Sequence, residues 1–227
     1  MITWTFIKEN YFMIAYAITL LISLATYRKY FDTALKYFPI IIAYTFFNEV
    51  LGYLVRNFDE ITFFKNLKYS NVNEIIYNIY AVVFFAFFYL VYWRLITNNK
   101  YKKWIVSAAI LTLIAYVISA IYQNPIETNL YYAIAVGSWS LIFCIVLYFK
   151  DKKDNEIALF EPYNLMFWIS VALFIFYLIF PILYIIGYTV YDIWVAYNLR
   201  AVLRVLIFLM YSLFIIGFLK GRRRAFK

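Results

Sequence analysis

The feature that most constrains this chain is a series of long apolar segments separated by short polar connections. Each segment is long enough for a helix to cross the hydrocarbon core of a bilayer, for which roughly 20 residues suffice. A helix is expected because it pairs its own backbone polar groups, which lipid cannot do. The pattern therefore predicts an all-α integral membrane protein, a single bundle of seven transmembrane helices with no soluble domain. The predicted helices cover about residues 11–27, 38–55, 75–97, 104–122, 129–149, 163–188 and 193–219.

Composition supports a membrane protein and excludes several kinds of chemistry. Of the 227 residues, 67% are hydrophobic and only 15% are charged, whereas soluble domains are about half apolar and a quarter charged. The chain has no histidine and one cysteine, Cys144. Histidine metal sites, histidine acid–base catalysis and an internal disulfide are thereby excluded. No predicted span contains an aspartate pair, and no known catalytic motif is present. We therefore expect no enzymatic activity, no metal and no cofactor.

The basic residues predict how the chain crosses the membrane. The net charge is +9, and most of the 21 basic residues lie in every second connection and in the C-terminal segment "KGRRRAFK". Connections rich in lysine and arginine stay in the cytoplasm. This rule places the N-terminus outside and the C-terminus inside, as in a multi-pass protein of the cell (inner) membrane. The positive charge therefore indicates contact with the lipid bilayer, and no nucleic-acid partner is expected.

Four ionisable side chains fall inside or at the edge of the predicted spans. The stretch "YNLRAVLRVLIF" places Arg200 about 10 Å and Arg204 about 16 Å below the outer edge of the last span, and Glu49 lies about 9 Å deep in the second. An unpaired charge at the centre of a span costs ~2.5–3.5 kcal/mol. We therefore predict an ion pair between Glu49 and one of the two arginines, with Glu74 as a second partner. Such a pair can also serve only to hold two helices together.

Polar residues at helical spacing surround these charges and predict a polar chamber in the outer half of the bundle. Lipid would penalise such stripes, so they are expected to face the interior. The connection 56–74 would cover the chamber from outside. The candidate residues for a ligand site or an intramembrane ion pair are Glu49, Arg200, Arg204, Glu74, Asn48, Asn78, Tyr53, Tyr177 and Tyr197.

These observations favour a receptor or sensor that binds a small ligand from outside the cell. Two arginines against one or two glutamates would leave spare positive charge, so the expected ligand is anionic or zwitterionic. Signalling would require a separate cytoplasmic or membrane protein partner, because the chain has no domain of its own there. Two alternatives remain open. The first is a small-solute transporter or channel, and the second is an accessory or scaffolding subunit of a larger membrane complex.

Overall fold

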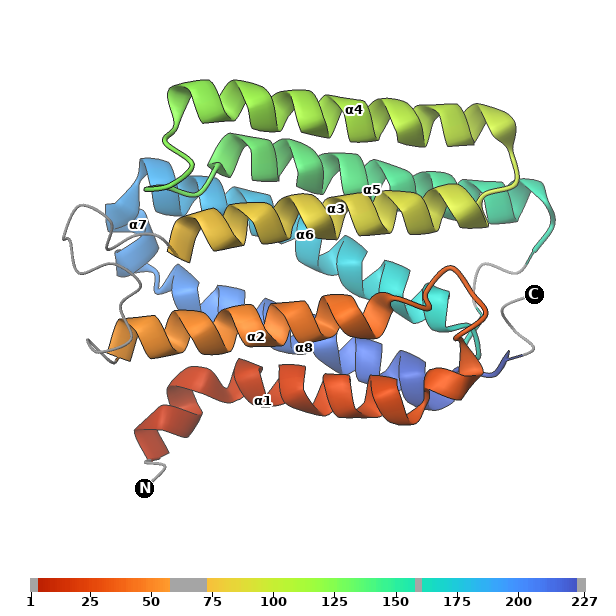
Figure 1. The fold of residues 1–227 in the computed structure, drawn as a ribbon, viewed down its shortest axis with the longest axis horizontal. Coiled ribbons are helices and arrows are strands. Elements are labelled where there is room, and N and C mark those ends of the chain that lie inside the picture. The colour runs from red at the N-terminus through yellow and green to blue at the C-terminus, as the bar shows by residue number, and fades with distance from the viewer. Residues whose placement is uncertain (1–3, 58–72, 158–160, 224–227) are drawn as a thin grey trace.

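The computed structural model describes residues 4–57, 73–157 and 161–223, with the side chains of 11–54, 74–157 and 161–223. This part of the chain is built from helices, and the long ones lie side by side along the longest axis of the molecule (Figure 1). They are α1 (Trp4–Ala25), η1 (Tyr27–Lys29), α2 (Phe38–Asn57), α3 (Asn73–Leu95), α4 (Asn99–Tyr122), α5 (Tyr131–Asp154), α6 (Leu165–Thr189), α7 (Tyr191–Ala196) and α8 (Leu199–Lys220).

Five of the described helices, α3, α4, α5, α6 and α8, are long and apolar enough to cross a membrane. Within the described residues, α1 and α2 contribute shorter apolar segments, Tyr11–Ala25 and Phe38–Leu54. The described part of the chain is therefore all-helical and has the character of a membrane-embedded, multi-pass bundle. The first six predicted segments correspond to α1–α6, with ends that differ by up to seven residues.

The last predicted segment, 193–219, is wrong as a single helix. The chain breaks between α7 and α8 at Tyr197 and Asn198, and Asn198 has φ 47° and ψ 46°. This left-handed conformation is one that asparagine tolerates better than most residues, and it stops a right-handed helix. As a result, Arg200 lies in the first turn of α8. Arg204 is only about 7 Å from the start of that helix, at 1.5 Å per residue.

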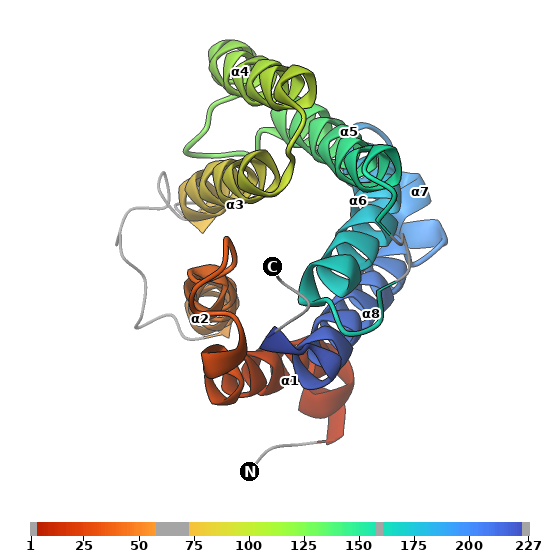
Figure 2. The same ribbon diagram turned by 90° about the vertical axis from the view of Figure 1, so that its right-hand side faces the viewer.

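Six helices, α1, α2, α3, α5, α6 and α8, form a ring when the bundle is viewed along its length (Figure 2). Helix α4 lies outside the ring and packs against α3 and α5. It is the most peripheral of the long helices and leaves one side free of protein contact. Residues on that side include Val117 (59% exposed) and Ile121 (75% exposed), which suits a face turned to lipid.

An aromatic layer fills the ring towards one end. We define it as Phe38 of α2, Phe88 and Tyr92 of α3, and Phe214 and Phe218 of α8, all at most 1% exposed. The ring centroid of Phe38 lies 5.7 Å from that of Phe88 and 5.2 Å from that of Phe214, with the rings edge to face. The hydroxyls of Tyr92 and Ser170, on α6, lie 3.0 Å apart. The layer thus joins four helices and leaves cavities on either side of it.

The end of the bundle nearest this layer, on the right of Figure 1, holds the connections α1–α2, α3–α4 and α5–α6. We call it the basic end. Here Lys29 Nζ donates to the carbonyls of Phe218 (3.3 Å) and Leu219 (3.1 Å) at the close of α8. Tyr30 is 1% exposed and its hydroxyl donates to the Ser23 carbonyl (2.6 Å). Burial raises the pKa of Tyr30 above its ordinary value, which keeps this hydroxyl a donor.

Candidate functional site: an aromatic cavity with a glutamate

A cavity of about 220 Å³ lies within the ring, in the half of the bundle farther from the basic end. We call it the tyrosine cavity, because six tyrosines line it together with one carboxylate. Its walls come from all six helices of the ring and from Asn129 before α5. The described lining residues are Tyr16, Thr45, Glu49, Tyr77, Tyr80, Ala81, Phe84, Phe85, Asn129, Ile134, Phe176, Tyr177, Phe180, Tyr184, Leu203, Ile207, Met210 and Tyr211.

The aromatic walls are held by ring contacts between helices. Tyr16 of α1 meets Tyr211 of α8 edge to face at a centroid distance of 4.4 Å. The ring centroid of Tyr177 of α6 lies 5.7 Å from that of Phe85 of α3. Such pairs contribute about 0.5–1.5 kcal/mol each beyond the area that they bury. The cavity therefore has a preformed shape, and its tyrosines come from helices that are far apart in the sequence.

Glu49 is the one charged side chain among the described residues that line the cavity. It lies one helical turn after Thr45, whose hydroxyl is 2.7 Å from that of Tyr80. A carboxylate at this depth favours a positively charged neighbour. The faces of tyrosine rings also attract cations, because of the ring quadrupole. The chemistry of the lining therefore suits an ammonium group and disfavours an anion.

The structure does not place Arg200, Arg204 or Tyr197 at this cavity. Tyr197 is 73% exposed, Arg200 is exposed and Arg204 is half-buried. The ion pairs within the described side chains are Lys152–Glu161 and Arg223–Asp32, so the predicted pairing of Glu49 with either arginine is not observed. The physical reason is the break at Asn198, which brings both arginines near the start of α8, whereas the residues of this helix that line the cavity are Leu203, Ile207, Met210 and Tyr211.

The remaining sequence candidates have different roles. Asn78 is 5% exposed and holds the α4–α5 connection: its Nδ2 donates to the carbonyls of Pro125 (2.9 Å) and Thr128 (3.0 Å), and its Oδ1 accepts from the N–H of Leu130 (3.0 Å). Glu74 accepts a hydrogen bond from Asn129, which lines the cavity. Asn78 and Glu74 thus do not line the cavity themselves, but they position the α4–α5 connection, which contributes Asn129 to the lining.

Of the other candidates, Tyr177 lines the cavity, whereas Asn48 and Tyr53 do not. Asn48 is 7% exposed, and its Nδ2 has no hydrogen-bond partner within the described part of the chain. Tyr53 is half-buried. The connection predicted to cover the chamber falls mainly in 58–72, outside the described residues.

The sequence candidates omitted seven polar residues of the lining, which are Tyr16, Thr45, Tyr77, Tyr80, Asn129, Tyr184 and Tyr211. A signal for Tyr16 was available, because Tyr16, Thr19 and Ser23 follow one another at intervals of three and four residues, and all three are buried. Tyr80 had no comparable signal in a chain with 25 tyrosines. Asn129 lies in a connection, where helical periodicity gives no information.

A second, larger cavity of about 640 Å³ lies at the basic end, on the other side of the aromatic layer. It is much more polar than the tyrosine cavity, and we call it the basic-end cavity. Its charged lining residues are Asp32, Lys36, Arg94, Asp151, Lys152 and Glu161. Lys152 pairs with Glu161, whose carboxylate also accepts from Asn164 Nδ2 at 2.8 Å. A polar, charged lining indicates that this end of the interior admits water.

The described helices thus define a multi-pass helical membrane protein with a small aromatic cavity and a polar cavity in series. No family model, curated protein or solved structure matches the chain. Its function is therefore inferred from the geometry of the two cavities.

Proposed function

We propose that this protein is a receptor or sensor of the cell inner membrane that binds a small amine, a cation or a zwitterion, in the tyrosine cavity. The observation that carries the proposal is the presence of Glu49 in a cavity lined by six tyrosines. An anionic or zwitterionic ligand was expected because of Arg200 and Arg204. Since neither arginine lines the cavity and Glu49 does, we favour a ligand with a positively charged group. The bundle would have seven spans, with its N-terminus outside and its C-terminus in the cytoplasm.

The ligand would be held by its ammonium group. The Glu49 carboxylate would act as its counter-ion, and tyrosine rings would contact it through their faces. The cavity volume of about 220 Å³ is below the 300–1,000 Å³ typical of sites for drug-sized molecules. A metabolite with few non-hydrogen atoms therefore fits better than a peptide or a nucleotide.

Helix α8 offers a physical route for a signal. Its residues Leu203 and Tyr211 line the cavity, and Phe214 and Phe218, further along the same helix, belong to the aromatic layer. A ligand that binds one position of α8 better than another would shift the bundle towards that position. The shift would reach the basic end, where a separate cytoplasmic protein could detect it.

The test is equilibrium binding of radiolabelled choline, ethanolamine and acetate to the protein in nanodiscs. We expect saturable binding of an amine and no saturable binding of acetate. Glu49→Gln should weaken amine binding about tenfold or more, the usual effect of losing a charge-assisted contact. Glu127→Gln is the matched control, because Glu127 is exposed in the α4–α5 connection and away from the lining. Preference for acetate, or equal binding by both variants, would contradict the proposal.

A second candidate function, transport of the same ligand, is favoured by the basic-end cavity. The two cavities lie in different halves of one bundle, with the aromatic layer between them. A solute in the tyrosine cavity would need a movement of Phe38 and Phe214 to pass. Uptake of the bound amine into proteoliposomes would support transport, and binding without uptake would support a receptor.

A further inference from the structure

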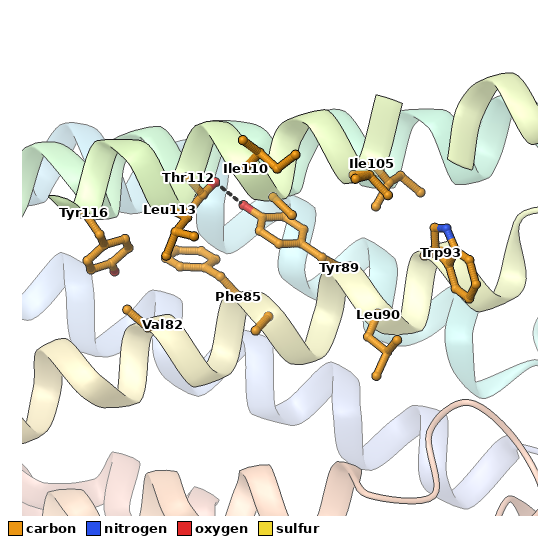
Figure 3. A pocket seen from close by; sticks show the side chains of 13 residues that line it. Val82, Phe85, Tyr89, Leu90, Trp93, Ile105, Ile110, Thr112, Leu113 and Tyr116 are labelled. Carbon is orange, nitrogen blue, oxygen red and sulfur yellow. Dashed lines mark hydrogen bonds between the residues drawn. The ribbon is translucent and has the colours of Figure 1, made fainter. Parts of the chain in front are cut away.

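A groove of about 540 Å³ runs along the outside of the bundle between α3 and α4 (Figure 3). It extends from Val82 and Tyr116 at one end to Trp93 and Ile105 at the other. Val82 and Trp93 are eleven residues apart, which corresponds to about 16 Å along α3. The two apolar helices thus form a long, narrow groove in the outer surface, which we call the α3–α4 groove.

The groove offers an occupant almost no polar group to bind. The most prominent hydroxyls in it, those of Tyr89 and Thr112, lie 2.7 Å apart and bond each other, as Figure 3 shows. The Tyr89 hydroxyl also lies 3.0 Å from the Gly137 carbonyl and donates to it. A third lining hydroxyl, that of Tyr116, has no hydrogen-bond partner among the described residues but is buried away from the groove surface. Since the hydroxyls of Tyr89 and Thr112 are bonded and that of Tyr116 is covered, a polar ligand would lose its own hydrogen bonds to water without replacement. A hydrocarbon chain suffers no such loss.

Cations lie at the end of the groove that is nearest the basic end. Lys102 Nζ is 5.2 Å from the ring centroid of Trp93, which closes the groove. On the other flank of α4, Lys100 Nζ is 5.2 Å from the ring of Trp104. Neither lysine belongs to an ion pair with a described carboxylate. Tryptophan with lysine is the usual pattern where a span meets the lipid headgroups, and lysines there attract anionic lipids.

We propose that the α3–α4 groove binds one acyl chain of an anionic phospholipid, whose phosphate lies against Lys102. The chain would occupy the groove from Trp93 towards Tyr116, and the headgroup would lie beside the first turn of α4. Chain burial alone does not select this lipid, because the surrounding bilayer is equally apolar. The charge of Lys102 would select an anionic headgroup, and the shape of the groove would fix the position of the acyl chain.

The experiment is a native mass spectrometry titration of the purified full chain with phosphatidylglycerol and with phosphatidylcholine of identical acyl chains. We expect one phosphatidylglycerol molecule to be retained in preference to phosphatidylcholine. Lys102→Gln should weaken its binding about fivefold, the effect of one basic residue near anionic lipid. Lys103→Gln is the control, because it removes the same charge from an exposed neighbour without a described ring contact.

A second pair of variants tests the groove itself. Ala109 lines the groove and Ala120 is an exposed residue of α4 outside it. Ala109→Phe should fill the α3–α4 groove and lower phosphatidylglycerol binding. Ala120→Phe adds the same ring outside the groove and should leave phosphatidylglycerol binding unchanged. Equal retention of both lipids, equal losses in Lys102→Gln and Lys103→Gln, or unchanged binding in Ala109→Phe would each overturn the proposal. So would a stable dimer that Ala109→Phe disrupts, because the groove would then hold a second copy.

Discussion

The carboxylate of Asp151, near the end of α5, accepts hydrogen bonds from both the backbone N–H (3.0 Å) and the hydroxyl (3.2 Å) of Thr97. It also accepts from the N–H of Asn98 (3.0 Å), the residue before α4. Asp151 is 4% exposed. A carboxylate beside the start of a helix is favoured by the helix dipole and by the free N–H groups there. Asp151 thus fixes the α3–α4 connection at the basic end.

Asp151→Asn keeps the shape of this side chain but removes its charge and one acceptor. We expect the free energy of unfolding to fall by about 2 kcal/mol, because charge-assisted hydrogen bonds contribute roughly 1.5–3 kcal/mol. Titration with sodium dodecyl sulfate in dodecyl maltoside micelles measures this. Asp192→Asn, at an exposed position in α7, is the control and should change little. Equal losses in the two variants would show that Asp151 does not act through these bonds.

Asn78 makes a second testable contact, with the α4–α5 connection. Its amide donates to two carbonyls and its oxygen accepts from Leu130. Asn78→Asp has the same shape but turns an acceptor towards the carbonyls of Pro125 and Thr128. We expect a loss of about 2–4 kcal/mol in the same unfolding assay, since buried carbonyls are left unpaired. Asn99→Asp, on an exposed residue, should be nearly neutral, and a similar loss there would contradict the interpretation.

The helices could be predicted from the sequence because span length and hydropathy are local properties. Their ends could not. Helix α4 begins at Asn99, and its first five residues include Lys100, Lys102 and Lys103. Hydropathy assigns these residues to a connection, so the predicted segment starts at residue 104. The Asn98 side chain caps the helix by accepting from the N–H of Lys100 at 2.9 Å, and the helix continues past the hydrocarbon into the headgroup region.

The candidate site was only partly predictable, for a different reason. Helical spacing selected Glu49 and Tyr177, and both line the tyrosine cavity. It treated Ile193 as the start of an unbroken helix, which placed Arg200 and Arg204 too deep. The break at Asn198 depends on a left-handed backbone conformation, which helical spacing does not predict.

The placement of Arg204 can be tested by a double-mutant cycle with Glu49. A direct ion pair would give a coupling energy of about 0.5–3 kcal/mol, whereas sites without contact are additive within about 0.3–0.5 kcal/mol. Because the structure shows no such pair among the described residues, we expect Glu49→Gln and Arg204→Gln to be additive in detergent unfolding. The same cycle with Arg200→Gln serves as an internal comparison. A coupling above about 1 kcal/mol would restore the pairing that the sequence suggested.

The left-handed backbone at the break between α7 and α8 predicts that position 198 tolerates glycine better than valine. At φ 47°, glycine has no steric penalty, and a residue with a Cβ costs roughly 1–2 kcal/mol. Asn198→Gly should therefore leave the unfolding free energy nearly unchanged, and Asn198→Val should lower it by about 1–2 kcal/mol. Asn99, an exposed residue at the start of α4 without positive φ, provides the control substitution to valine. If Asn198→Val were neutral, the chain would continue helically through this point.

The close approach of Phe85 to Gly137 predicts that the effect of Gly137→Ala on the free energy of unfolding depends on the residue at position 85. A Cβ at Gly137 would lie 2.6 Å from Cε2 of Phe85, a ring that lines the tyrosine cavity. Gly137→Ala should therefore cost about 1–3 kcal/mol through overpacking. In a Phe85→Leu background the clash is relieved, so Gly137→Ala should become neutral or stabilising by up to about 1 kcal/mol, because alanine favours a helix over glycine. Detergent unfolding of the four proteins measures this. An equal cost in both backgrounds would show that Phe85 is not what excludes a side chain at residue 137.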